Sequence, residues 1–89
     1  MLPIDILTTI EEALKFVEMD INDRVTRGEG HKDLDHMKAE LIEMKSEKRK
    51  SASDTISRII VDSMDWNQPS LKKFNEVREL LRKHYRLFP

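Results

Sequence analysis

Apolar side chains recur at steps of three and four residues between Asn67 and Pro89, and this spacing constrains the fold more than any other feature of the sequence. At about 3.6 residues per turn, it places these side chains on one face of a helix. The face comprises Leu71, Phe74, Val77, Leu81, Tyr85 and Phe88. Three of the five aromatic residues of the chain belong to it, so the last helix is expected to supply the bulkiest part of the core.

The rest of the chain contains three more segments with helical spacing. Their apolar stripes are Ile6, Leu7, Ile10, Leu14, Val17, Ile21 and Val25, then Leu34, Met37, Leu41 and Met44, and finally Ile56, Ile59, Ile60 and Met64. The sequence therefore predicts an all-α fold, a small antiparallel bundle of three or four helices at residues 4–26, 31–49, 52–65 and 69–87. A single helix from His31 to Trp66 stays open as an alternative, because the serines and the alanine at 51–53 do not forbid a continuous helix.

The expected helix ends follow from local sequence signals. Gly28 suits the left-handed position that ends a helix, and residues 28–30 then make a short turn into an antiparallel neighbour. The first helix has two possible starts, one with Pro3 in the first turn and one with Thr8 and Glu11 as a capping box.

A chain of 89 residues is expected to form a single helical domain over residues 1–89, with one small core. The residues expected in that core are Ile10, Leu14, Val17, Ile21, Leu34, Leu41, Ile56, Ile60, Phe74, Val77, Leu81 and Tyr85.

The composition argues against most catalytic chemistry. The chain has no cysteine, which excludes a disulfide or a thiolate metal site, and its two glycines cannot form a glycine-rich phosphate loop. The three histidines do not complete a set of metal ligands. We therefore expect no enzyme activity, no cofactor and no metal. No apolar run approaches the roughly 18 residues of a membrane span, and no signal peptide is evident, which favours a cytoplasmic protein without a membrane partner.

The net charge of −1 hides a gradient along the sequence. Residues 1–30 hold seven acids and three bases, whereas residues 71–89 hold two acids and six bases. The favoured interpretation is attraction between these segments within one bundle. The alternative is a nucleic-acid-binding regulator that uses the basic last helix, together with the basic run at 45–50. The residues of that helix that would contact nucleic acid are Lys72, Arg78, Arg82, Lys83 and Arg86.

Two groups of apolar residues are candidates for binding a partner. Phe16 and Met19 lie off the main stripe of the first helix, on the side that carries Glu12 and Lys15. Met37 and Met44 belong to the narrow seam of the second helix, where a second copy of the chain could pack. The leading hypothesis is therefore a small non-enzymatic protein-interaction module or regulator that binds another protein or itself, in the latter case as a homodimer. A small immunity or phage-type inhibitor is a further alternative.

Overall fold

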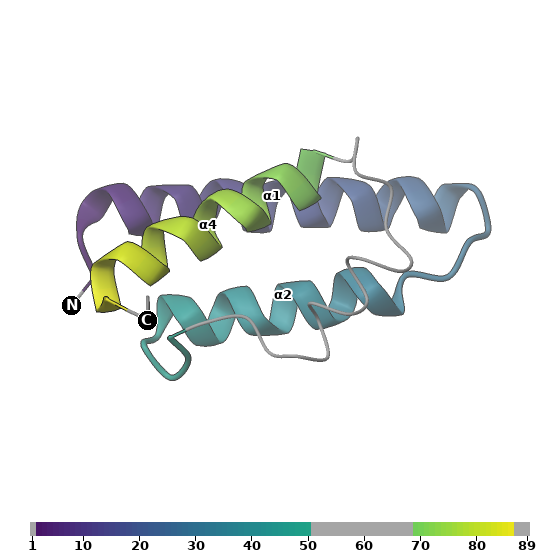
Figure 1. The fold of residues 1–89 in the computed structure, drawn as a ribbon. Coiled ribbons are helices and arrows are strands. Elements are labelled where there is room, and N and C mark those ends of the chain that lie inside the picture. The colour runs from purple at the N-terminus through teal and green to yellow at the C-terminus, as the bar shows by residue number, and fades with distance from the viewer. Residues whose placement is uncertain (1, 51–68, 87–89) are drawn as a thin grey trace.

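The computed structural model describes residues 2–50 and 69–86, and in these residues it contains helices and no strand. The helices are α1 (Ile4–Thr26), α2 (Lys32–Lys45) and α4 (Pro69–Tyr85). The predicted all-α class is confirmed. α2 and α4 both run opposite to α1, as Figure 1 shows. The helix expected at residues 52–65 lies outside the described residues, as do Ile56, Ile60 and Trp66.

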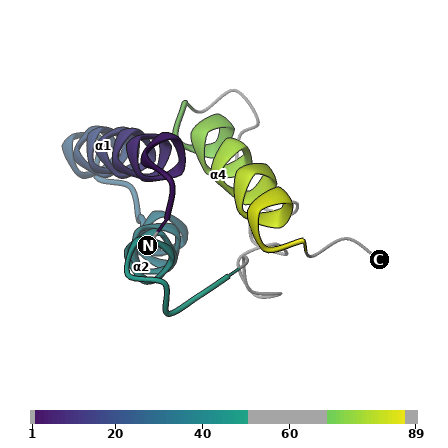
Figure 2. The same cartoon turned by 90° about the vertical axis from the view of Figure 1, so that its left-hand side faces the viewer.

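α1 packs against both α2 and α4. Viewed end-on in Figure 2, the helices α1, α2 and α4 lie at the corners of a triangle, with α2 below α1 and α4 to its right. The buried positions of α1 repeat at steps of three and four, which keeps them on one face. They are Ile6, Ile10, Ala13 and Val17. Both neighbouring helices therefore pack against the same apolar stripe of α1.

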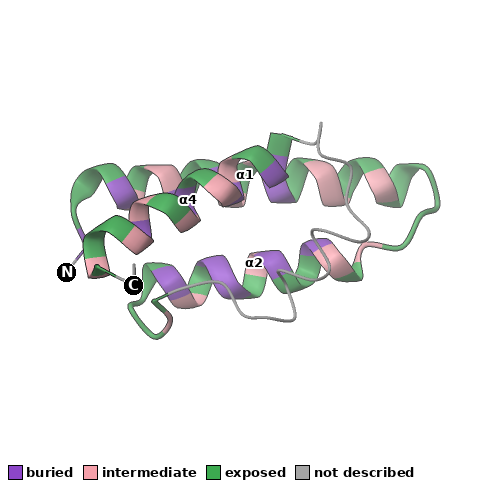
Figure 3. Cartoon of the chain, viewed as in Figure 1, coloured by how far each residue is buried: buried purple, intermediate pink, exposed green. Residues whose placement is uncertain are grey.

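The core lies between the facing stripes of these helices, as the buried positions in Figure 3 show. The predicted core residues that are buried are Ile10, Val17, Leu34, Leu41, Phe74, Val77 and Leu81. Leu14, Ile21 and Tyr85 were also expected in the core, and they pack against its edge while staying partly exposed. Phe74 is the largest of the fully buried side chains, in agreement with the expectation that α4 supplies the bulkiest part of the core.

The first turn of α1 begins at Ile4, which excludes the alternative start at Thr8. The other end of α1 is closed by two backbone hydrogen bonds, from Gly28 N to Val25 O and from Glu29 N to Arg24 O. Together with φ of 72° at Gly28, this pair of bonds is a Schellman motif, in which glycine is favoured at the left-handed position. The predicted turn after α1 is confirmed.

α2 ends with the same motif and earlier than expected. The sequence predicted a helix to residue 49, but α2 stops at Lys45. Glu47 takes the left-handed position with φ of 63°, its N–H donates to Met44 O, and the N–H of Lys48 donates to Glu43 O. A non-glycine residue gives no sequence signal for this conformation. Because the helix stops here, the alternative of one helix from His31 to Trp66 is wrong.

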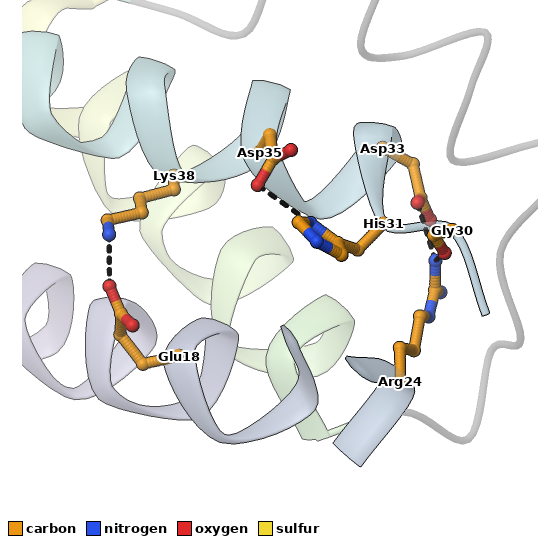
Figure 4. Close-up of polar contacts among 7 residues, drawn as sticks. All are labelled: Glu18, Arg24, Gly30, His31, Asp33, Asp35 and Lys38. Atoms are coloured by element: carbon orange, nitrogen blue, oxygen red, sulfur yellow. Dashed lines mark hydrogen bonds and ion pairs between the residues drawn. The ribbon is translucent and has the colours of Figure 1, made fainter. Parts of the chain in front are cut away.

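Polar contacts join α1 to α2 around the turn, as Figure 4 shows. The guanidinium of Arg24 donates to Gly30 O at 3.3 Å and to Asp33 Oδ1 at 2.5 Å. The side chains of Arg24 and Asp33 are only 13% and 15% exposed, so this ion pair is largely shielded from solvent. Further along, Lys38 pairs with Glu18. The hairpin therefore has charged contacts at its turn and along its length.

Two acids of α1 contact the first two turns of α4. The carboxylate of Asp20 accepts a hydrogen bond of 3.3 Å from the backbone N–H of Ser70, and Glu12 pairs with Lys73 at 3.0 Å. The first N–H groups of a helix have no partner within it, so Asp20 caps α4 from a distant part of the sequence. These contacts match the expected attraction between the acidic start of the chain and its basic last helix.

Replacing Asp20 with alanine is expected to lower the free energy of unfolding by about 1 kcal/mol, because the first turn of α4 loses its cap. Asp20→Asn keeps an oxygen acceptor and is expected to keep most of that stability. Asp23→Ala is the matched control, since Asp23 pairs only with the half-exposed Arg27 among the described residues. Urea denaturation of the three variants measures the difference. Equal losses for Asp20→Ala and Asp23→Ala would contradict the capping role.

Candidate functional site

A surface depression of about 360 Å³ lies on α1 over the off-stripe residues Phe16 and Met19. Its described lining consists of these two side chains together with Glu12 and Lys15. Met19 is 56% exposed, and Phe16 is half-buried. The structure thus brings together the pair that the sequence predicted as a partner-binding site, on the face where helical projection placed it.

The position of the depression follows from the register of α1 against α4. Glu12 and Asp20 lie four residues before and after Phe16, so the three side chains are neighbours along one side of the helix. Both acids contact the first two turns of α4. Phe16 therefore lies beside the seam between α1 and α4, whereas Met19 lies further out toward solvent.

One acid and one base line the depression, and the acid already has an ion-pair partner. Glu12 is already paired with Lys73, which also contacts Glu76 at 3.4 Å. The hydrogen bond to Glu12 is the main cause that raises the pKa of Lys73 above its ordinary value. Lys15 forms no ion pair with the residues that the structure describes. The depression thus presents two apolar side chains, one neutralised acid and one base available to a partner.

Met37 and Met44 lie elsewhere. Both are fully buried on the core face of α2, the same face that carries Leu34 and Leu41. The structure does not place them near Phe16 and Met19. Both were predicted as partner-binding residues, but neither side chain offers an exposed surface that a partner could contact. The physical reason is the spacing of the seam, since steps of three and four are equally the spacing of a helix face that packs inside one chain.

The basic residues of α4 do not form one continuous cationic face. Arg78 donates to Asn75 at 3.1 Å and Arg82 pairs with Glu79 at 3.2 Å. The other three cations of the predicted nucleic-acid site, Lys72, Lys83 and Arg86, are exposed. Two acids, Glu76 and Glu79, are exposed among them. A phosphate backbone along this face would meet both signs of charge.

At the far end of α4, the loop after α2 meets the helix terminus. Lys50 Nζ lies 5.3 Å from the centroid of the Tyr85 ring, and the ring of His84 meets that of Tyr85 edge-on at 4.8 Å. Burial of the phenol is the larger cause that raises the pKa of Tyr85, and the negative charge of Glu47 adds to it. This end joins two basic segments that are distant in sequence.

A second depression of about 280 Å³ lies on the outer face of α2, where its described lining is Lys32, Asp35, His36 and Ala39. His31 Nδ1 lies 3.0 Å from Asp35 Oδ1 beside it. Within residues 2–50 and 69–86, no three side chains of the types that bind metals are grouped as a metal site. In the same residues, no helix has the length and apolar character needed to cross a membrane.

No protein-family model, no curated protein and no solved structure matches the chain. Any function assigned to it rests on the geometry of its own residues.

The two kinds of methionine give a direct check on the site. Met37→Ala is expected to lower the free energy of unfolding by about 2–5 kcal/mol, because it leaves a cavity in the core. Met19→Ala makes the same chemical change within a helix but at a half-exposed position, and is expected to alter stability by less than about 0.5 kcal/mol. Chemical denaturation measures both values. Similar losses for the two variants would show that Met19 is a core residue.

Tyr85 is the single tyrosine of the chain, so absorbance at the phenolate band reports its titration alone. Its pKa is expected to lie above the ordinary value of about 10, and Glu47→Gln should lower it. Because the folded chain favours the neutral phenol, the raised pKa of Tyr85 adds to the free energy of unfolding at pH values below about 10. This contribution is lost as the pH rises through the pKa that Tyr85 has in the folded chain. A pKa at or below the ordinary value would contradict the burial of the ring.

Proposed function

We propose that this chain is a small non-enzymatic protein-interaction module, one helical domain built as an antiparallel bundle of three or four helices. Its partner is another protein that places an apolar side chain into the depression at Phe16 and Met19. The observation that carries this proposal is a surface depression on α1 lined by two large apolar side chains one turn apart, the exposed Met19 and the half-buried Phe16.

The chemistry of the depression supports a protein partner. Phenylalanine and methionine are enriched in the buried centres of interfaces, and the flexible thioether of methionine adapts to different shapes. Glu12 and Lys15 supply the polar rim that such centres have. Phe16 and Met19 are spaced i,i+3, which matches the anchors that a helix presents when it packs against a partner helix.

The other hypotheses draw less support from these residues. A second copy of the chain could occupy the depression through the same patch on both copies, and it is treated as an outcome of the test below. An immunity or phage-type inhibitor is a narrower form of the same proposal, supported only by size and helical class. Binding of nucleic acid along the face of α4 is disfavoured by the exposed acids Glu76 and Glu79.

A photo-reactive amino acid in place of Lys15 tests the proposal, because position 15 lines the depression and is exposed. Irradiation in the source cells is expected to give a covalent adduct with one specific protein. The double variant Phe16→Asp with Met19→Asp should abolish the adduct. The matched control is Ile4→Asp with Val25→Asp, which adds the same charge to α1 at positions that are 75% and 58% exposed, and it should keep the adduct.

Each result of this experiment has a defined meaning. An adduct between two copies of the chain would replace the proposed partner with self-association. Equal loss in both double variants, with helical content intact by circular dichroism, would show that the depression is not the binding site. Loss of helical content in Phe16→Asp with Met19→Asp alone would show that these two residues belong to the packing of the bundle.

A further inference from the structure

One end of the bundle brings together cations from two segments that are distant in sequence. The loop after α2 and the last turn of α4 meet there, since Lys50 lies over the ring of Tyr85. In Figure 1 this is the end at which α1 begins, α2 ends and α4 ends. We define the cationic end as the side chains of Lys48, Lys50, Lys83, His84 and Arg86.

Most of the charge at the cationic end has no ion pair among the described residues. Lys48, Lys50, Lys83 and Arg86 are all exposed, and none of them forms an ion pair within the described part of the chain. The neighbouring acids are largely engaged, because Glu43 pairs with Arg49 at 2.7 Å and Glu79 pairs with Arg82 at 3.2 Å. The exposed Glu47 is the main opposing charge in the loop.

Helix dipoles account for part of this arrangement but leave an excess of positive charge. Cations near the last turns of α2 and α4 complement the negative ends of those helices. α1 starts at the same end of the bundle, and its first turn adds a partial positive charge. A dipole interaction requires only one nearby cation at each helix end, so it does not explain why the two segments carry four exposed cations between them at the end where Lys50 lies over the Tyr85 ring.

We propose that the cationic end binds single-stranded nucleic acid through its phosphate backbone. Lysine and arginine side chains contact phosphates without a preformed pocket and release counterions when they do so. His84 is exposed and lies edge-on to Tyr85, which gives an unpaired base an aromatic ring on which to stack. Cations combined with an exposed ring favour a single strand over an acidic protein segment, which has no base to stack. This site is separate from the depression at Phe16 and Met19 and does not depend on the proposed function.

The test is fluorescence anisotropy with a labelled oligouridine of about 16 nucleotides, between about 50 and 200 mM NaCl. Lys48→Gln with Lys83→Gln removes one cation from each segment of the cationic end. Lys32→Gln with Lys72→Gln is the matched control, because it removes two exposed lysines from the first residues of α2 and α4, away from that end. Neither pair contains Lys50, so the contact with Tyr85 stays intact.

The first double variant is expected to bind about tenfold more weakly at the lowest salt, and the control less than about threefold. The slope of log affinity against log salt should fall in magnitude by about 1.4, which corresponds to two phosphate contacts with a single strand. His84→Ala should weaken binding by a similar factor at every salt concentration, because stacking releases no counterions.

Three outcomes would overturn the proposal. The first is no binding of the unaltered chain to the oligouridine at about 50 mM NaCl. The second is an equal loss in both double variants, which would indicate attraction by net charge alone. The third is binding of poly-glutamate in place of the oligouridine, which would assign the cationic end to an acidic protein partner. Retained binding in Phe16→Asp with Met19→Asp would show that this site is independent of the depression.

Discussion

The described part of the structure depends on the burial of a single stripe of α1 by two neighbouring helices. Ile10, Ala13 and Val17 are fully buried, and α2 and α4 both pack against this helix. Apolar burial is the main favourable term in folding, but it has no direction, so it does not set which helix lies on which side of the stripe. Polar groups at the two borders of the stripe supply that information.

The acids of α1 divide between those two borders. Glu11 and Glu18 contact Lys45 and Lys38 of α2, whereas Glu12 and Asp20 contact the first two turns of α4. Adjacent residues of a helix point about 100° apart, so the neighbouring Glu11 and Glu12 reach different partners. Exposed ion pairs contribute little stability each, but together they favour one arrangement of the helices around α1 and disfavour others.

Much of the fold could be predicted from the sequence, because apolar spacing and glycine chemistry are local signals. The bounds of α1, the turn at Gly28 and most of the core follow from them. The end of α2 could not be predicted, since Glu47 adopts a left-handed conformation that glutamate seldom takes. The cap at Ser70 was also inaccessible, because Asp20 is fifty residues away in sequence and no local pattern connects the two.

The candidate site was predictable only where a residue departed from its helix stripe. Phe16 and Met19 were distinguishable because they lie off the apolar stripe of α1, and in the structure Phe16 is half-buried and Met19 is exposed. Met37 and Met44 were not distinguishable from core residues, since partner binding and internal packing require the same periodicity. The cationic end depends on the meeting of Lys50 with Tyr85, which is a tertiary contact without a signal in either segment.

α4 adjoins both proposed surfaces, and its attachment to α1 differs along its length. Phe74, Val77 and Leu81 pack into the core along its middle, and Leu71 is fully buried in its first turn, where the backbone N–H of Ser70 also donates to Asp20. The hydroxyl of Ser70 is buried there without a hydrogen-bond partner in the described part of the chain, and such a group carries a desolvation cost. The first turn of α4 is thus held by the burial of Leu71 and the cap from Asp20, and the unpartnered hydroxyl of Ser70 offsets part of that stability. A partner at the depression would contact α1 where that turn is attached, so the packing of α4 is the route by which binding there would affect the rest of the bundle.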